Sequence, residues 1–95
     1  MTAWALEGFE EALDRWIALE QPTADLRVAV TAWILTRFDE PYVGVWRAPG
    51  FDNLWFGSIP TSLHGDNMVV TCSYWIFERE QKLRCDSFAT LSLPI

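Results

Sequence analysis

The stretch VVTCSYWIF, residues 69–77, decides the fold, because it has the alternation of a β-strand and carries apolar side chains on both sides. One side is apolar throughout and is expected to face a core; it comprises Val70, Cys72, Tyr74 and Ile76. The other side carries two large rings, Trp75 and Phe77. What these rings contact is the main question that the sequence raises.

The same stretch begins a hairpin, with strands predicted over residues 68–78 and 83–92. If Glu80 and Gln81 lie at the centre of the turn, the apolar positions of both strands share one side. The predicted cross-strand pairs are Val70–Leu91, Cys72–Ala89, Tyr74–Ser87 and Ile76–Cys85. This register separates Cys72 from Cys85 by about 13 Å at roughly 3.3 Å per residue. Two free thiols are therefore expected.

The opposite side of the predicted hairpin is a candidate binding face. In this register Trp75 lies opposite Asp86, Phe77 opposite Arg84, and Phe88 opposite Ser73. The predicted binding residues are Trp75, Phe77, Arg84, Asp86 and Phe88. Rings that alternate with an acid and a base suit recognition of a partner, and Arg84 over Phe77 would form a cation–π pair. The alternative is a second small core, in which the N-terminal segment or residues 60–67 cover these rings.

Two helices are expected before the sheet. Over residues 5–20, apolar side chains recur every three or four positions, acids fill the opposite side, and Pro22 ends the segment. Residues 24–38 carry a second apolar stripe after Thr23, although their β-branched residues also alternate as in a strand. The length of this second segment favours a helix.

After Pro41 the period changes to two, which predicts strands over residues 42–47 and 54–59. The fold class is therefore α+β: two N-terminal helices packed on one face of a four-stranded, mainly antiparallel curved sheet. A chain of 95 residues is expected to form a single domain over residues 1–95.

The distribution of charge bears on the kind of partner. The chain has 13 Asp and Glu against 7 Lys and Arg, a net charge of −6. An acidic protein repels phosphate backbones, so nucleic-acid binding is disfavoured. Most of the acids fall in residues 1–40, which form either a solvated helical surface or a surface that attracts a basic protein partner.

Location and cofactors are also constrained. No segment approaches the roughly 18 apolar residues of a membrane span, and the first residues lack the features of a signal peptide. We therefore expect a cytoplasmic protein without membrane association. The two cysteines lack CxxC spacing and His64 is the single histidine, so neither a metal site nor a cofactor is expected.

Residues suited to catalysis are few. His64, in the stretch SLHGD, is the one histidine that could transfer a proton. Arg79, Lys82 and Arg84 lie among glutamates at the end of the hairpin. This charged cluster either keeps the hairpin soluble or forms an edge that contacts phosphate.

Three stretches together resemble the RelE/ParE toxin superfamily: DEPYVG at 39–44, NLWF at 53–56 and VVTCSYWIFERE at 69–80. The resemblance implies two helices on one face of a curved antiparallel sheet. It also implies that the uncovered face and its edges bind a ligand, which is RNA in the RelE branch, and that a cognate antitoxin wraps the protein.

Carried onto this sequence, the resemblance implies face and edge positions. The face residues would be Trp75, Phe77, Arg84 and Phe88, and the edge residues Arg47, His64, Arg79 and Lys82. The chain also departs from the family pattern. It has Gly57 and Ser58 where a strand arginine is common, and its C-terminal LSLPI has no basic residue.

We interpret the sequence as a small acidic, noncatalytic protein–protein interaction module of the kind found in toxin–antitoxin, immunity or phage–host conflict systems. One alternative is a RelE-like mRNA endoribonuclease toxin, with Arg84, Arg79 and His64 as its catalytic residues. Another is a homodimeric structural or accessory protein that buries the aromatic face.

Overall fold

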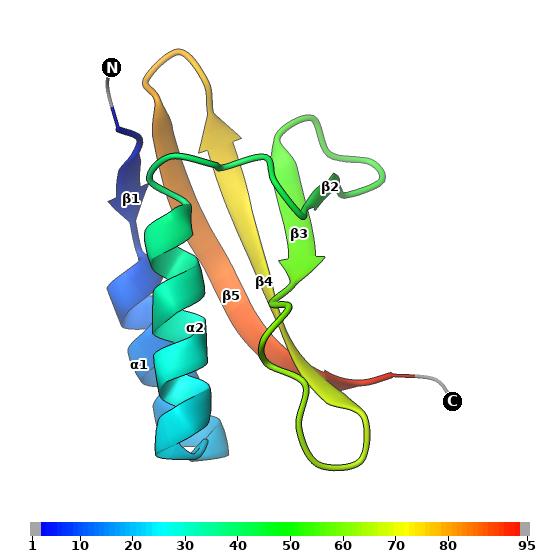
Figure 1. Cartoon of the computed structure of the whole chain (residues 1–95). Coiled ribbons are helices and arrows are strands. Elements are labelled where there is room, and N and C mark those ends of the chain that lie inside the picture. The colour runs from blue at the N-terminus through cyan, green and yellow to red at the C-terminus, as the bar shows by residue number, and fades with distance from the viewer. Residues whose placement is uncertain (1–2, 94–95) are drawn as a thin grey trace.

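The computed structural model describes residues 3–93 and contains two helices and a five-stranded sheet (Figure 1). The elements are β1 (Ala5–Glu7), α1 (Phe9–Glu20), α2 (Ala24–Thr36), β2 (Trp46–Arg47), β3 (Leu54–Ser58), β4 (Met68–Phe77) and β5 (Lys82–Ser92). The strand order is β1-β5-β4-β3-β2, with β1 parallel to β5 and the other neighbours antiparallel. The predicted α+β class, with two helices packed on one face of a mainly antiparallel sheet, is confirmed.

The start of the chain differs from the prediction, because residues 5–7 form strand β1 rather than the first turn of a helix. Leu6 pairs with Leu83 of β5, and Glu7 pairs with Arg84. Gly8 then takes a φ of 74°, a conformation that favours glycine, and α1 begins at Phe9. Leu6 packs on the same core as α1, which is why its spacing fits the helical pattern. The sheet therefore has five strands rather than four.

Residues 24–36 form a helix, not a strand. The hydroxyl of Thr23 accepts a hydrogen bond from the backbone N–H of Leu26 at 3.3 Å and caps the helix. Val30 and Trp33 face the core. At the end of the stripe Arg37 is buried and Phe38 is partly exposed, so the arginine is the inward residue.

The segment before β2 also differs from the prediction. Pairing with β3 is confined to Trp46 and Arg47, and residues 41–44 form a turn in which Gly44 has a φ of 76°. This turn lies against Gly57 of β3, where an added Cβ would be 2.4 Å from the carbonyl oxygen of Gly44. Glycine at position 57 thus permits a close backbone approach.

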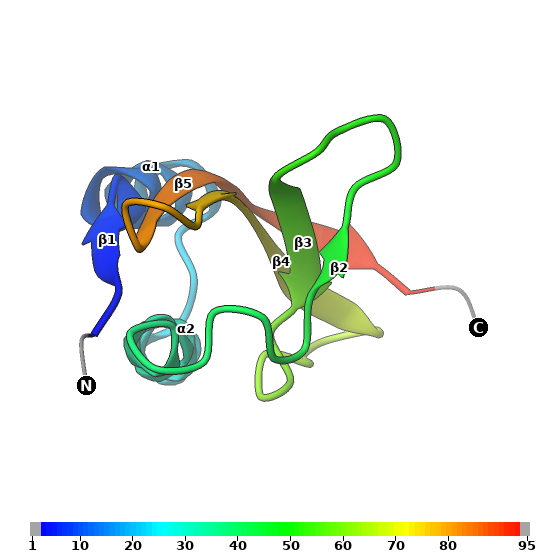
Figure 2. The same ribbon diagram turned by 90° about the horizontal axis from the view of Figure 1, so that it is seen from above.

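Figures 1 and 2 show how the two halves of the sheet differ. Helices α1 and α2 lie beside β1, β5 and β4, while β3 and β2 extend away from them on the other side of β4. The turn at residues 41–44 covers the part of β3 that the helices do not reach. None of the helices among residues 3–93 is long and apolar enough to span a membrane.

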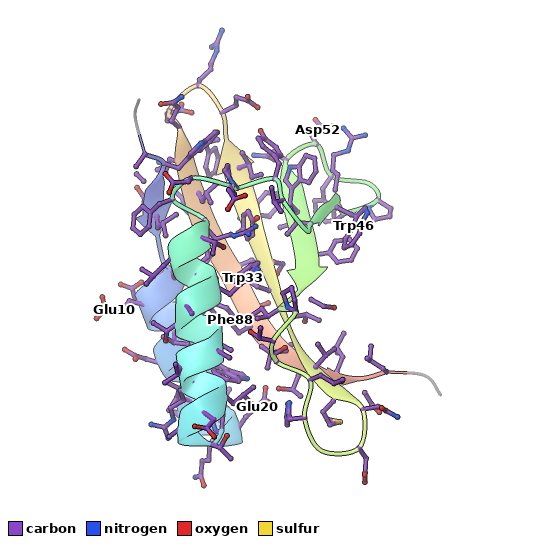
Figure 3. The ribbon with its side chains drawn as sticks, viewed as in Figure 1. Glu10, Glu20, Trp33, Trp46, Asp52 and Phe88 are labelled. Carbon is purple, nitrogen blue, oxygen red and sulfur yellow. The ribbon has the colours of Figure 1, made fainter. Side chains whose placement is uncertain are left out.

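Large rings fill the layer between the helices and the sheet, and Figure 3 shows Trp33 and Phe88 within it. The ring centroid of Phe9 lies 5.9 Å from that of Tyr74 and 6.5 Å from that of Phe88. Trp16 lies 6.4 Å from Phe88, and Trp33 lies 6.3 Å from Tyr74. Each such ring removes roughly 150–250 Å² from water, which lets a short chain assemble a core.

A buried cation joins α2 to the sheet. Arg37 is 3% exposed; its Nη1 donates to the carbonyl of Val43 at 2.8 Å and to the hydroxyl of Tyr74 at 3.1 Å. The guanidinium also lies 4.4 Å from the ring centroid of Trp33. Tyr74 in turn donates to the carbonyl of Pro41. The network links the end of α2, the 41–44 turn and β4 through the buried side chains of Arg37 and Tyr74.

The register of the β4–β5 hairpin differs from the prediction. The observed pairs are Val70–Thr90, Cys72–Phe88, Tyr74–Cys85 and Ile76–Leu83. On β5, each predicted partner therefore lies C-terminal to the observed one, by one residue in the first two pairs and by two residues in the other two. The change occurs at a β-bulge between Ser73 and Tyr74, where Asp86 is the extra residue of β5.

The bulge decides which side chains of β5 face the core. Beyond it, Phe88 points toward the helices and is 8% exposed, whereas before it Leu83 is the fully buried residue. Since the bulge shifts the alternation by one residue, Asp86 and Ser87 both point away from the helices and reach Ser73 on β4. The placement of Phe88 on the binding face was wrong for this reason.

Candidate functional site

We call the sheet face that points away from the two helices the outer face. It consists of side chains that alternate with the core-facing ones on each strand. Its residues on β2 to β5 are Trp46, Leu54, Phe56, Ser58, Val69, Thr71, Ser73, Trp75, Phe77, Lys82, Arg84, Asp86, Ser87, Ala89 and Leu91. The face is the natural place to look for a binding site, because it combines exposed rings with a small set of charges.

At the hairpin end of the outer face, the two predicted rings are partly covered. Phe51, from the loop before β3, packs edge-on against Trp75 with ring centroids 5.8 Å apart. Lys82 Nζ and Arg84 Cζ lie 5.2 Å and 5.3 Å from the centroid of Phe77. Trp75 and Phe77 are therefore half-buried. The predicted cation–π contact exists, although Phe77 pairs with Lys82 across the strands rather than with Arg84.

The positive and negative charges of the outer face are equal in number. Glu7, from β1, lies 3.6 Å from Lys82 Nζ and 3.7 Å from Arg84 Nε. Asp86 accepts a hydrogen bond from the hydroxyl of Ser73 at 3.0 Å. Both cations thus share the carboxylate of Glu7, and with Asp86 counted the face carries no excess positive charge.

The other end of the outer face is apolar and more exposed. Trp46, at the β2 edge and distant from both helices in Figure 3, is 63% exposed. Phe56 and Leu91 are also exposed, at 42% and 53%. These three side chains surround a hollow of about 200 Å³ whose floor includes Gly57 and Thr71. A flat apolar side chain of a partner would fit in such a hollow.

Four of the five predicted binding residues lie on the outer face, and Phe88 does not. Trp75, Phe77, Arg84 and Asp86 point outward, because the alternation of β4 and of the tip of β5 does not depend on the bulge. The sequence reading missed Trp46, Phe56 and Leu91. Pairing β3 with β4 in the sequence would have placed Phe56 beside Ser73 on the outer face.

The residues considered for catalysis are not brought together. His64 bridges to Met68 at one end of β4, and its Nδ1 lies 2.7 Å from the carbonyl oxygen of Ser62. Arg79 follows β4 at its other end, about 30 Å away at roughly 3.3 Å per residue. Arg84 lies near the Arg79 end and contacts Glu7. A proton-transfer group and a phosphate-binding cation therefore do not share one site.

Two further groups lie near the hairpin end of the molecule. Tyr42 donates a hydrogen bond to the Glu78 carboxylate; partial burial and this neighbour raise the pKa of Tyr42 to about 12, so its phenol stays neutral at pH 7. Arg47 pairs with Trp55 and points to the opposite side of the sheet from Trp46. Neither adds a charge to the outer face. Among residues 3–93, no group of three or more His, Cys, Asp or Glu could hold a metal ion.

The two cysteines lie close together, contrary to the distance expected from the predicted register. Cys85 pairs with Tyr74, so its sulfur reaches Cys72 on the core side, with the two Sγ atoms 4.0 Å apart. Both are free thiols. Burial raises the pKa of Cys72 well above its ordinary value, and the neighbouring Cys85 adds to this effect.

This geometry predicts unequal reactivity of the thiols. After denaturation without reductant, an alkylating reagent is expected to add two equivalents, as measured by intact mass. In the native protein Cys85 should react first, because Cys72 is buried and its raised pKa lowers its thiolate fraction. A denatured sample that takes up label only after reduction would instead mean that the two sulfurs are joined.

Comparisons with known proteins bear on the fold. No protein-family model matches the sequence, and no curated protein matches it. Among solved structures, the isolated E. coli RelE toxin is similar, with a TM-score of 0.68 and 13% identity over 97% of this chain and 88% of that one. An E. coli RelE mutant with two arginines changed to alanine, in the free state, has a TM-score of 0.61 and 13% identity over 92% and 82%. The fold of this chain is therefore RelE-like, as the sequence resemblance implied.

Proposed function

We propose that this chain is a noncatalytic protein–protein interaction module that binds a protein partner through its outer face. The observation that carries the proposal is the exposed apolar end of that face, where Trp46, Phe56 and Leu91 surround a hollow. Tryptophan and phenylalanine are enriched in protein interfaces and supply much of their binding energy. Half-buried Trp75 and Phe77, with Arg84 and Asp86 beside them, continue the surface toward the hairpin end.

The charges of the outer face favour a protein over a nucleic acid. Binding of a phosphate backbone needs uncompensated cations, whereas Lys82 and Arg84 both lie beside Glu7. The net charge of −6 adds a long-range repulsion. A protein partner, by contrast, gains from the apolar end and can complete hydrogen bonds at the charged side chains.

The RelE-like fold supports a proposal about the biological system to which this chain belongs. RelE is a toxin, and we propose that this chain belongs to a toxin–antitoxin, immunity or phage–host conflict system in the cytoplasm. Its partner would then be another protein of that system. A noncatalytic role agrees with the separation of His64 from Arg79 along the length of β4.

The proposal predicts that binding depends on Trp46. A tagged chain would be used to capture its partner from the native host, and the captured protein would then be purified and titrated. Trp46→Ala is expected to weaken the complex about tenfold or more, since buried tryptophans at interface centres contribute strongly. Leu19→Ser is the matched control, because Leu19 is 83% exposed on α1, away from the outer face.

Three outcomes would contradict the proposal. Equal binding by wild type and Trp46→Ala would place the contact elsewhere. Equal loss in Leu19→Ser would mean a general effect of removing an exposed apolar side chain. A dimer of the 10.9 kDa chain that Trp46→Ala dissociates would mean that the outer face binds a second copy.

An mRNA endoribonuclease is the second candidate, and one observation favours it. The similar RelE mutant carries two substituted arginines separated by one residue, and Lys82 and Arg84 have the same spacing on β5. If this pair acts on RNA, expression should arrest growth and Arg84→Ala should relieve the arrest. We expect harmless expression instead, because Glu7 lies beside both cations.

A further inference from the structure

We propose a second docking surface, on the helical side of the molecule, that binds a basic amphipathic helix of a partner. It consists of the groove between α1 and α2 together with the exposed side of α2, and is here called the helix groove. Its residues are Leu6, Phe9, Glu10, Leu13, Arg27, Val28, Thr31, Ala32, Ile34, Leu35 and Phe38. This surface lies on the opposite side of the sheet from the outer face and does not depend on the function proposed for that face.

The composition of α2 is the first reason for the proposal. Its sequence, ADLRVAVTAWILT, is apolar on nearly every side, although one side alone packs on the core. Val30 and Trp33 are buried, whereas Val28 and Leu35 are 68% and 59% exposed. A surface helix usually carries polar residues on its solvent side, and a helix that is apolar all round is usually buried. The exposed side of α2 is therefore suited to being covered.

The shape of the surface is the second reason. Between the two helices lies a depression of about 340 Å³, lined by Phe9 and Leu13 of α1 and by Ile34 and Leu35 of α2. A second depression of similar size continues over Val28 and the outside of α2 and shares Leu35 with the first. A groove between two helices is shaped for the apolar side of a third helix.

The charge around the groove determines the kind of partner. Glu10 lines the groove and points outward from α1 in Figure 3, and Asp14 follows one turn later on the same side of the helix. Asp39 and Glu40 follow the C-terminal end of α2 and are exposed. The cation within the surface is Arg27, whose Nε donates to the carbonyl of Pro22.

Acids therefore outnumber cations around an apolar groove, and a cationic partner fits both features. A second copy of this chain fits less well, because each copy carries a net charge of −6 and would bring the same acids to the interface. Helix α2 has 13 residues, so a complementary helix of about 14 residues would cover it at roughly 1.5 Å per residue. Leucines every three or four positions would fill the groove, and lysines would flank it.

The test uses three synthetic peptides of equal length and intact protein. The first peptide combines leucine and lysine in an amphipathic helical order, the second replaces lysine by glutamate, and the third scrambles the order of the first. We expect the first to bind best by titration calorimetry, with an affinity that falls as salt rises. Hydrogen exchange should slow in residues 9–14 and 26–38 when it binds, and should not change in β3.

Protein variants separate the apolar contribution to peptide binding from the electrostatic contribution. Leu35→Ser is expected to weaken binding about tenfold, since it removes an apolar contact at the centre of the groove. Glu10→Gln with Asp14→Asn should weaken it and flatten its dependence on salt. Leu63→Ser is the matched control, because Leu63 is 60% exposed, close to the 59% of Leu35, lies outside both surfaces and should leave peptide binding unchanged. The thermal midpoint of each variant would verify that it folds.

Several results would overturn the proposal: absence of binding, equal binding of the scrambled or the acidic peptide, or an unchanged affinity in Leu35→Ser. A dimer that Leu35→Ser converts to monomer would also overturn it, because a second copy would then occupy the groove. Trp46→Ala tests binding at the outer face, and Leu35→Ser tests binding at the helix groove. A negative result for one surface therefore does not decide whether the other binds a partner.

Discussion

Replacement of Arg37 by methionine is expected to lower the free energy of unfolding by about 2–3 kcal/mol, because it removes a buried donor that serves both the Val43 carbonyl and the Tyr74 hydroxyl. Arg37 is 3% exposed, and its guanidinium donates to the carbonyl of Val43 and the hydroxyl of Tyr74. Methionine keeps much of the volume beside Trp33 but donates nothing. Urea unfolding followed by circular dichroism would measure the change.

Arg27→Met is the control for this prediction. Arg27 lies on α2, the helix that ends just before Arg37; it is exposed and donates to the carbonyl of Pro22 at 3.3 Å. Its replacement should change stability by no more than about 0.5 kcal/mol, as is usual for surface positions. If the two variants lose the same stability, the buried network does not hold α2 to the sheet. Tyr74→Phe combined with Arg37→Met would then measure how strongly the two side chains are coupled.

Phe88→Ala is expected to cost about 3–5 kcal/mol, the range found when a buried ring is removed from a core. Phe88 lies against Phe9 and Trp16, and the adjacent side chains cannot close the space without moving α1. Phe56→Ala, which removes the same ring from the exposed outer face, should cost far less. Chemical denaturation of the two variants side by side would measure the difference.

This comparison also tests the register of the hairpin. In the register predicted from the sequence, Phe88 is a surface residue and its removal would be nearly neutral. A small effect of Phe88→Ala together with a large effect of Ala89→Asp would therefore support the predicted register and contradict the bulge. The opposite pattern is expected here, because Ala89 points to the outer face and can hold a polar side chain.

The sequence predicts the class of the fold because strong periodicities dominate it. The three- and four-residue spacing before Pro22 and the length of residues 24–38 indicate helices, and the alternation after Pro41 indicates strands. Strand β1 escaped prediction because Leu6 continues the spacing of α1 while packing on the core from the sheet. A three-residue strand has too few positions to show a period of its own.

The register could not be read from β5, because this strand carries apolar residues on both sides. Phe88 and Leu91 lie on opposite sides in the structure, yet either could face a core. An extra residue such as Asp86 changes the alternation without a signal in the sequence. The positions of Trp75 and Phe77 were predictable, because the alternation of β4 alone places them on the outer face. The position of Trp46 on the outer face could not be predicted without knowing how β2 and β3 pair.

Strand β1 has a consequence for synthesis on the ribosome. It pairs Leu6 with Leu83, so the first strand of the chain closes on the last. A nascent chain cannot complete this sheet until the residues of β5 have been translated, and contacts between such distant residues are slow to form. During elongation α1 lacks β5, its partner in the core, which leaves Phe9 and Trp16 exposed. A chain that ends before β5 is therefore expected to expose these rings and to be prone to aggregation.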